Sequence, residues 1–363
     1  MIAWFATKGS GTNEGHRMAA LISGLPATAE IPFDKQRKIS SFFRILSEVR
    51  RLRPELLVME GSGLAGGGAC LLARLLFGIP YVVSSGDAIG PFIGSHHPGL
   101  GPIFTLYERA LCRCSAGFIG WTPYLTGRAL TFGARRAMTA PGWAIGGDHP
   151  PPSARETVRM RLGIGADRIV FGLVGALEWN AAKRYCYGLE LVRAIRRIRR
   201  PEVVVLIVGG GSGLERLREE AGPLLDRRVF LPGPVPLEEV SAVLSALDVA
   251  LLPQSLDAVG MFRYTTKISE YTTMRLPIIT NRIPMAYDLD HDGIWRLPGR
   301  APWDETFLAA LAARMESVTR AEIADTRERI SGLGAVFNEE KQKKSVSAFL
   351  AELLEDLHAS PAA

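Results

Sequence analysis

The chain has 363 residues, of which 47% are hydrophobic and 22% charged, as is typical of a soluble globular protein. This length is more than a single hydrophobic core usually fills, so two domains are expected. The formal net charge of +6 suits an anionic partner, such as nucleotide phosphates, an acidic membrane surface or nucleic acid.

The cysteines and the first residues of the chain indicate the cellular compartment in which the protein is expected. The spacing of Cys70, Cys112, Cys114 and Cys186 fits neither a paired zinc site nor a disulfide framework. The N-terminus has no basic segment and no cleavage signal. Uninterrupted apolar runs stay below the ~20 residues that cross a bilayer. We therefore expect a cytoplasmic protein.

The chain opens with a predicted strand, Met1 to Ala6, then a Gly-rich loop and a helix from about His16 to Leu25. Strand, Gly-rich loop and helix in this order are the beginning of a doubly wound α/β unit. Gly9 and Gly11 either let the backbone approach a ligand closely or form a flexible turn.

Residues 33 to 53 are predicted to form a basic amphipathic helix. Apolar residues recur at the helical period, and seven Lys or Arg residues lie among them. The helix either packs on a sheet with a solvated basic face or contacts anionic lipid, where each cation adds ~1 kcal/mol.

A strand from Glu55 to Glu60 is followed by Gly61 to Gly66, which matches G-x-G-x-x-G before a helix, and Asp87 lies further on. This pattern is found in dinucleotide-binding proteins, so an NAD-dependent oxidoreductase is one alternative. Against it, another βα unit precedes this one and Asp87 lies in a loop.

The next segment, from Pro80 to Asp87, is predicted as a strand with its exit loop. His96 and His97 lie in a Gly/Pro-rich stretch that is predicted to be a loop. Prolines and glycines between Gly146 and Ser153 stop both helix and strand, so we place a linker there. The predicted domains are residues 1–148 and 149–337, followed by a C-terminal helix and tail at 338–363.

The second half repeats the strand and helix alternation of a parallel sheet. Apolar strands are predicted at 169–175, 203–209, 228–231 and 249–252, and the first two end in glycine, at Gly175 and Gly209. Near the end of this half, Asp288, Asp290, His291 and Asp292 lie close together. Their spacing lacks the rest of a calcium-loop pattern, so a polar turn and no metal site is predicted.

Leu251 to Thr280 is the stretch that bears most on function. It contains the end of a buried strand, a loop, a helix begun by Thr265 and Thr266, and another buried strand. Lys267 and Glu270 share one face of this helix near its start, where the dipole favours an anion. They are either a surface ion pair or a nucleotide site, and a position beyond the carboxyl end of a strand favours the nucleotide.

These residues resemble a known family. Thr266-Lys267-Ile268-Ser269-Glu270-Tyr271, followed by Arg275-Leu276-Pro277-Ile278-Ile279, is similar to the nucleotide-sugar motif of family 4-like glycosyltransferases with the GT-B fold. The resemblance implies two Rossmann-like doubly wound domains that face a cleft. It departs from the family at Phe262, where a Glu is common, and at Arg275, where Gly is common.

The resemblance also implies site residues. Glu270 would bind the donor ribose, while Lys267, Thr266 and either Lys183 or Arg184 would hold the diphosphate. The loop with Gly175 would lie beside them, and Pro234 and Val235 would lie against the nucleobase. On the acceptor side it implies a loop with Gly11 and Asn13, and Asp87 as a catalytic base or sugar ligand.

The implied function is that of a hexosyltransferase-like enzyme. It would move a sugar from a nucleoside diphosphate-sugar to an acceptor sugar or lipid-linked saccharide, with retention, without a metal or other cofactor, in cell-surface polysaccharide or glycolipid assembly. Peripheral contact with the inner face of an anionic membrane is implied, and no nucleic-acid partner. A GT-B-like sugar-nucleotide 2-epimerase shares the donor site and is a further alternative.

Overall fold

A computed structural model describes residues 1–143, 150–289, 293–330 and 336–359. The chain divides into two compact units. Unit 1 comprises Met1–Gly142, Phe262–Tyr264 and Val336–Ala363, and unit 2 comprises Trp143–Met261 and Thr265–Ala335. The first half of the predicted linker, residues 146–149 with the boundary at 148/149, lies outside the described residues.

Unit 1 is built on a six-stranded sheet in the order β2-β1-β3-β4-β5-β6, with every pairing parallel. Its strands are β1 (Ile2–Ala6), β2 (Thr28–Glu30), β3 (Leu56–Glu60), β4 (Tyr81–Ser85), β5 (Gly117–Gly120) and β6 (Ala137–Thr139). The four central strands are buried along their whole length, which is why their sequences are apolar rather than alternating. The strand order reverses between β1 and β3.

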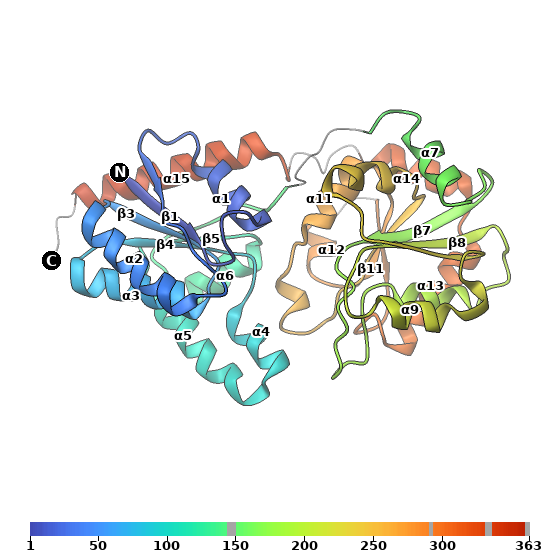
Figure 1. The fold of residues 1–363 in the computed structure, drawn as a ribbon, viewed down its shortest axis with the longest axis horizontal. Coiled ribbons are helices and arrows are strands. Elements are labelled where there is room, and N and C mark those ends of the chain that lie inside the picture. The colour runs from blue at the N-terminus through green and yellow to red at the C-terminus, as the bar shows by residue number, and fades with distance from the viewer. Residues whose placement is uncertain (144–149, 290–292, 331–335, 360–363) are drawn as a thin grey trace. The chain divides into compact units, whose positions relative to one another are not determined.

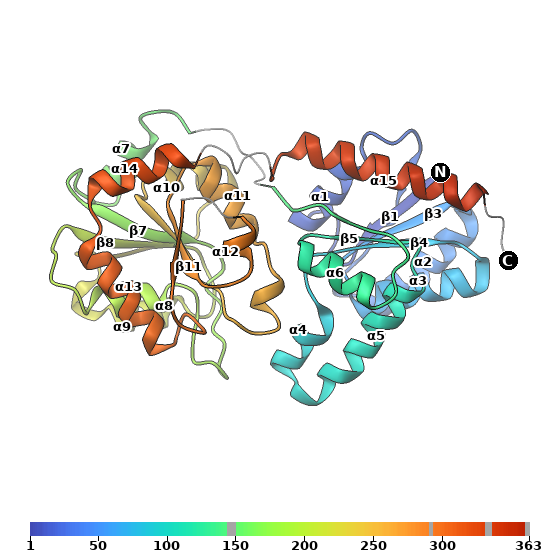
Figure 2. The ribbon, with the colours of Figure 1, turned by 180° about the vertical axis from the view of Figure 1, so that it is seen from behind.

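Helices connect these strands. They are α1 (Asn13–Ile22), α2 (Lys38–Leu52), α3 (Leu64–Phe77), α4 (Ile89–His96), α5 (Gly101–Arg113), α6 (Pro123–Thr131) and, from the end of the chain, α15 (Glu339–Ala359). A short 3-10 turn, Pro98–Leu100, separates α4 from α5. In Figure 1 and Figure 2, α15 lies along unit 1 beside α1, and the two helices are in contact.

Unit 2 has a second six-stranded parallel sheet, in the order β12-β11-β10-β7-β8-β9. Its strands are β7 (Ile169–Val174), β8 (Val203–Val208), β9 (Val229–Gly233), β10 (Val249–Leu252), β11 (Ile278–Asn281) and β12 (Ile294–Leu297). Here the order reverses between β7 and β10. In open α/β sheets, ligands bind at such reversals, beyond the carboxyl ends of the strands.

The helices of unit 2 are α7 (Ala154–Arg161), α8 (Leu189–Ile195), α9 (Leu214–Ala221), α10 (Val240–Ser245), α11 (Thr266–Thr273), α12 (Met285–Asp288), α13 (Glu305–Ser317) and α14 (Arg320–Arg329). Short 3-10 turns lie at Gly222–Leu224, Leu237–Glu239 and Gly260–Phe262. Helix α8 contacts both α9 and α13, and α7 contacts α10. In Figure 1, α9 and α13 lie on one side of the sheet and α7 and α14 on the other.

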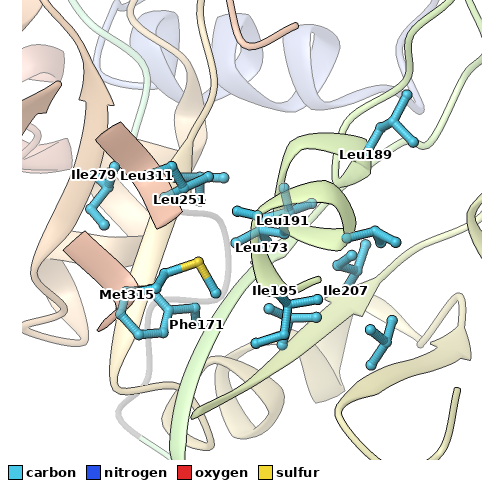
Figure 3. Close-up of a cluster of buried hydrophobic side chains, with 14 of the residues drawn as sticks. Phe171, Leu173, Leu189, Leu191, Ile195, Ile207, Leu251, Ile279, Leu311 and Met315 are labelled. Carbon is cyan, nitrogen blue, oxygen red and sulfur yellow. The ribbon is translucent and has the colours of Figure 1, made fainter. Parts of the chain in front are cut away.

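The core of unit 2 joins the sheet to α8 and α13 (Figure 3). Phe171 and Leu251, from neighbouring strands, are at most 1% exposed, and so are Leu191 and Leu311 from the two helices. Fully burying one such side chain stabilises the fold by about 1.5–3 kcal/mol. Together these contacts fix the strands whose carboxyl ends carry the loops described below.

The two parallel sheets, each between layers of helices, confirm the predicted pair of doubly wound α/β domains. Within the described parts of the chain, no helix combines the length and apolar character needed to cross a bilayer.

Candidate functional site

The start of α11 lies at the strand reversal of unit 2, because α11 follows β10 after a loop. Its N-cap is Thr265, whose side chain makes no capping hydrogen bond. The hydroxyl of Thr265 is buried and has no hydrogen-bond partner among the described residues. We expected Thr265 and Thr266 to cap this helix, but the Thr265 hydroxyl does not accept a hydrogen bond from the N–H groups of the first turn. Uncapped N–H groups at a helix start attract an anion.

Lys267 of α11 lies against the backbone after β7. A Cβ atom on residue 175 would lie 2.6 Å from Cε and 2.8 Å from Nζ of Lys267, so only glycine fits there without displacing the lysine. Nζ of Lys267 also lies 5.7 Å from the centroid of the Tyr187 ring. Since β7 and β10 are parallel neighbours, the predicted residues Gly175 and Lys267 meet at one edge of the sheet.

Glu270 follows on the same helix. Burial raises the pKa of its carboxyl, while the charge of Lys267 acts in the opposite direction. A carboxylate held in this partly desolvated place is a strong acceptor for hydroxyl groups. Unit 2 thus holds a lysine, a carboxylate and an uncapped helix start close together.

Lys183 and Arg184 lie in a tight hairpin closed by two backbone hydrogen bonds between Asn180 and Tyr185. Lys183 Nζ lies 3.3 Å from Oδ2 of Asp257. Arg184 has a left-handed backbone, with φ of 49°, which is uncommon for a residue other than glycine. Both side chains line a pocket to which neither Lys267 nor Gly175 contributes.

Pro234 and Val235 follow directly after β9, at the same edge of the sheet as Gly175. Pro234 is exposed and Val235 half-buried. Gly210, which follows β8, lies next to Pro234, since a Cβ on residue 210 would be 3.5 Å from the Pro234 ring. An exposed proline beside a glycine leaves a flat surface that a planar ring can cover.

In unit 1, Asp87 follows β4 and is engaged by an arginine. Arg263 Nε donates to Oδ1 of Asp87 at 2.6 Å, and the Arg263 guanidinium lies 5.5 Å from the centroid of Phe92. The carboxylate is partly exposed, with 36% of its side chain open to solvent. One oxygen of Asp87 therefore neutralises Arg263, a partner 176 residues away that the sequence did not suggest.

Gly11 and Asn13 lie beside the strand reversal of unit 1. Asn13 is the first residue of α1, whose N-cap Thr12 accepts a hydrogen bond from Gly15 N. A Cβ built on Gly11 would meet no atom within 4 Å, so packing does not require a glycine at position 11. Asn13 thus begins a helix three residues earlier than we predicted.

The segment around His96 was expected to be a loop and is a helix. Residues 89–96 form α4, and the glycines of this segment serve helix packing. A Cβ on Gly94 would lie 3.2 Å from Cα of Gly101, and one on Gly90 would lie 2.9 Å from Cα of Thr105. The prediction of a loop was wrong because these glycines allow two helices to approach, rather than breaking one.

The glycines of G-x-G-x-x-G also have a packing role. A Cβ on Gly66 would lie 2.7 Å from Cγ2 of Thr7 and 2.8 Å from the Phe5 ring, so glycine allows α3 to pack against β1. Gly61 has φ of 92° and faces the Thr7 hydroxyl. These contacts account for Gly61 and Gly66 without a dinucleotide.

Comparisons with known proteins find a family match in unit 2, where the Lys267 and Glu270 cluster lies. Residues 168–317 match the family model "Glycosyl transferases group 1", and this range includes Gly175, Lys267 and Glu270. Residues 168–317 are a glycosyl transferases group 1 domain. This confirms the family that the Lys267 and Glu270 motif predicted.

Two curated relatives share part of the sequence. A 2-deoxystreptamine N-acetyl-D-glucosaminyltransferase of Streptomyces fradiae is 37% identical over 111 residues, which are 30% of this chain and 26% of the relative. A D-inositol 3-phosphate glycosyltransferase of Corynebacterium urealyticum is 31% identical over 159 residues, which are 41% of this chain and 36% of the relative. The matches therefore span about a quarter to a third of these relatives.

The similarity in fold extends further than the sequence match. HepE of Anabaena, solved in complex with UDP and glucose, superimposes with a TM-score of 0.72 at 14% identity, over 97% of this chain and 100% of that one. The likeness shows the fold, which is the GT-B architecture that the sequence predicted.

Sequence reasoning missed two features near the candidate residues. One is Tyr187, whose ring faces Lys267. The only sequence signal for this contact was an aromatic residue directly before Gly188 in the loop after β7. The other is a buried ion pair in unit 1, where Arg17 Nη1 lies 2.8 Å from Oε2 of Glu60. Trp121 Nε1 donates to Oε1 of Glu60 at 3.1 Å. The Arg17 guanidinium carbon lies 4.4 Å from the centroid of the Trp121 ring.

This cluster joins the carboxyl ends of the central strands of unit 1. Arg17 belongs to α1, Glu60 ends β3, and Trp121 follows β5. Burial raises the pKa of Glu60 and lowers that of Arg17, while each charge acts on the other in the opposite direction. The hydrogen bonds between these side chains tie α1 to the ends of β3 and β5, next to the loops that carry Gly11 and Asp87.

Proposed function

We propose that this protein is a glycosyltransferase that moves a sugar from a nucleoside diphosphate-sugar to an acceptor, with the donor held by the group 1 domain. The main support is the contact of Lys267 with Gly175 at the strand reversal of unit 2. A cation and a helix start beyond the carboxyl ends of parallel strands support the binding of a diphosphate there. Glu270 then accepts hydrogen bonds from the two ribose hydroxyls.

Departure of the nucleoside diphosphate develops negative charge on the leaving phosphate. Lys267 Nζ and the N–H groups at the start of α11 are fixed before the reaction, so they stabilise that charge without reorganising. We propose that they supply the stabilisation that a divalent cation supplies in other sites, and that transfer proceeds without added metal. Activity that persists in excess chelator would support this step.

UDP is the first nucleotide to test, because HepE was solved with UDP. Pro234 and Val235 are the proposed contacts of the base, and Lys183 or Arg184 remains a proposed contact of the diphosphate. Unit 1 is the proposed acceptor unit, through Gly11, Asn13 and Asp87. The two curated relatives are named for different acceptors, so the acceptor class here is a proposal: a sugar or lipid-linked saccharide in polysaccharide or glycolipid assembly, joined with retention.

Helix α2 supports a peripheral membrane contact at the inner face of a membrane. It buries Ile45 and Val49 completely and leaves Ile39 and Phe43 exposed by 77% and 63%. Its last turn and C-cap carry Arg50, Arg51 and Arg53. Exposed apolar side chains beside cations bind anionic bilayers. Co-sedimentation with anionic vesicles at low salt should fall for Phe43→Ser. It should not change for Met160→Ser, which alters an even more exposed apolar residue of unit 2.

The deciding experiment measures nucleotide binding and turnover in the same preparations. Calorimetry with UDP should show binding to the wild-type protein and a large loss for Glu270→Ala. Glu328→Ala, which removes an exposed carboxylate from α14 of the same unit, should bind as the wild type does. A thermal-shift screen of UDP-, GDP-, ADP- and dTDP-sugars identifies the donor. Equal affinity of wild type and Glu270→Ala would refute the donor site.

A further inference from the structure

Unit 2 has a pocket of about 640 Å³ that neither Lys267 nor Glu270 lines. It lies between the hairpin closed by Asn180 and Tyr185 and the helices α8 and α9. Its lining residues are Trp179, Lys183, Arg184, Leu189, Arg193, Arg196, Arg216, Glu219, Glu220 and Trp303. This volume is within the range of small-molecule sites, which is about 300–1,000 Å³.

The lining is strongly cationic, with five Lys or Arg side chains against two carboxylates. The carboxylate of Glu220 lies 3.4 Å from Nε of Arg193, and Arg196 donates to the backbone carbonyl of Glu220 at 2.6 Å. Within the described ranges, no carboxylate forms an ion pair with Arg184 or Arg216. The pocket therefore has positive charge that its own acids do not neutralise.

Aromatic rings carry two of these cations. The Arg216 guanidinium lies 4.4 Å from the centroid of Trp179, and Lys183 Nζ lies 5.0 Å from that of Trp303. Such stacking orients a guanidinium while leaving its N–H donors at the edge free to bind. Buried Leu189 adds an apolar contact. Indole and leucine surfaces suit the C–H groups of a saturated ring.

Arg184 is held at this pocket at a cost. Its left-handed backbone, with φ of 49°, is less favourable for an L-residue than the right-handed one. A glycine in the same hairpin would avoid that cost but would remove a cation from the lining. Residues held in sparsely populated backbone conformations cluster at sites that bind ligands.

We propose that this pocket binds a phosphate monoester attached to a saturated ring, such as a sugar phosphate, through Arg193 and Arg216, which are not among the proposed contacts of the donor. Arginine is the side chain that best matches phosphate oxygens, through pairs of parallel N–H donors. Arg193 and Arg216 approach from two helices, so they contact different oxygens of one phosphate. The ring packs on Leu189 and the indoles. This inference does not depend on the proposed transfer reaction.

The test is calorimetry of the full-length protein with glucose 6-phosphate at low salt, with and without saturating UDP. We expect binding in both conditions, weaker binding of inorganic phosphate, and none of glucose. Arg216→Gln and Arg193→Gln should each weaken binding of glucose 6-phosphate about tenfold and leave UDP binding unchanged. Arg227→Gln, which removes an exposed cation of unit 2 outside the pocket, should bind as the wild type does.

Three results would overturn the proposal. One is the absence of binding at millimolar glucose 6-phosphate. Another is competition by UDP, which would place glucose 6-phosphate in the donor site and not in a separate one. The third is equal affinity in wild type, Arg216→Gln and Arg193→Gln. If UDP does not bind, the proposed function is refuted. Binding of glucose 6-phosphate to Arg216→Gln, Arg193→Gln and the control Arg227→Gln still tests the proposal for this pocket.

Discussion

Lys267 Nζ lies where the side chain of residue 175 would begin, with 2.8 Å between the nitrogen and a Cβ built on Gly175. The two residues are 92 positions apart and come from different βα units of one sheet. Gly175 thus has a role that its own loop does not reveal, because it leaves space for the lysine of α11.

Gly175→Ala should therefore weaken nucleotide binding with little effect on folding. The new methyl group displaces only the flexible end of Lys267, so the melting temperature should change little. UDP affinity in calorimetry should fall about tenfold, or ~1.4 kcal/mol. Gly127→Ala, at a helical position where a Cβ meets nothing within 4 Å, is the control for adding a methyl group. Unchanged UDP affinity in Gly175→Ala would argue against a phosphate contact for Lys267.

Glu270 should make nucleotide binding depend on pH. Burial raises its pKa, so the carboxylate is lost on acidification at a higher pH than an ordinary Glu. UDP affinity should fall as the pH drops through that raised pKa, since the neutral acid is a poorer acceptor for ribose hydroxyls. Calorimetry from pH 4 to 8 measures this. Glu270→Gln should flatten the profile, and an unchanged profile would remove Glu270 from the ribose contact.

The same raised pKa affects stability with a defined sign. The folded state favours the protonated acid, so the contribution of Glu270 to the free energy of unfolding is greatest below its unfolded pKa and is lost as pH rises through the folded value. Glu270→Gln should therefore be more stable than wild type at pH 7, with the difference shrinking on acidification. Urea unfolding at pH 4 and pH 7 measures both values. A difference that grows on acidification would contradict the assigned direction.

Asp87 should affect turnover more than stability. Its ion pair with Arg263 is partly exposed, and such pairs contribute about 0–1 kcal/mol. Asp87→Asn should lower the rate of sugar transfer at saturating donor while the melting temperature stays near that of wild type. Asp325→Asn breaks an exposed pair with Arg329 in α14 and should change neither quantity. Full activity in Asp87→Asn would remove this residue from the reaction.

The buried pair of Arg17 and Glu60 should show the opposite behaviour. Removing one charge leaves the other buried without its counter-ion, which destabilises a fold by roughly 3–5 kcal/mol. Urea unfolding of Glu60→Gln should show a loss of that order. Glu352→Gln, which breaks an exposed pair with Arg136 in the same unit, should unfold like the wild type. Equal stability of Glu60→Gln and wild type would show that the pair is not needed for folding.

The sequence predicted the central strands well because they are buried on both faces, whereas the edge strands β2 and β12 were not predicted. A run such as 203–208 is apolar throughout, and β8 occupies those residues. The shared face of Lys267 and Glu270 was predictable because helical geometry fixes which residues are neighbours. Family resemblance then gave these two residues a role that spacing alone left open.

Other features depend on contacts that no local pattern contains. The segment of α4 was predicted to be a loop because it is rich in glycine. The residues that these glycines pack against, Gly101 and Thr105, belong to the next helix, so no local pattern indicates the packing. The partner of Asp87 is 176 residues away. Thr265 has the residue type of an N-cap, yet whether its hydroxyl reaches a backbone N–H depends on its rotamer in the folded loop.

The division of the chain has a consequence for its synthesis. The chain passes from one unit to the other at 142/143, 261/262, 264/265 and 335/336, and α15 belongs to unit 1. Gly117 of β5 illustrates this, because a Cβ there would lie 2.8 Å from Leu353 of α15. The unit that begins to leave the ribosome first therefore lacks one of its helices until all of unit 2 has been synthesised, and it is the last of the two to be completed.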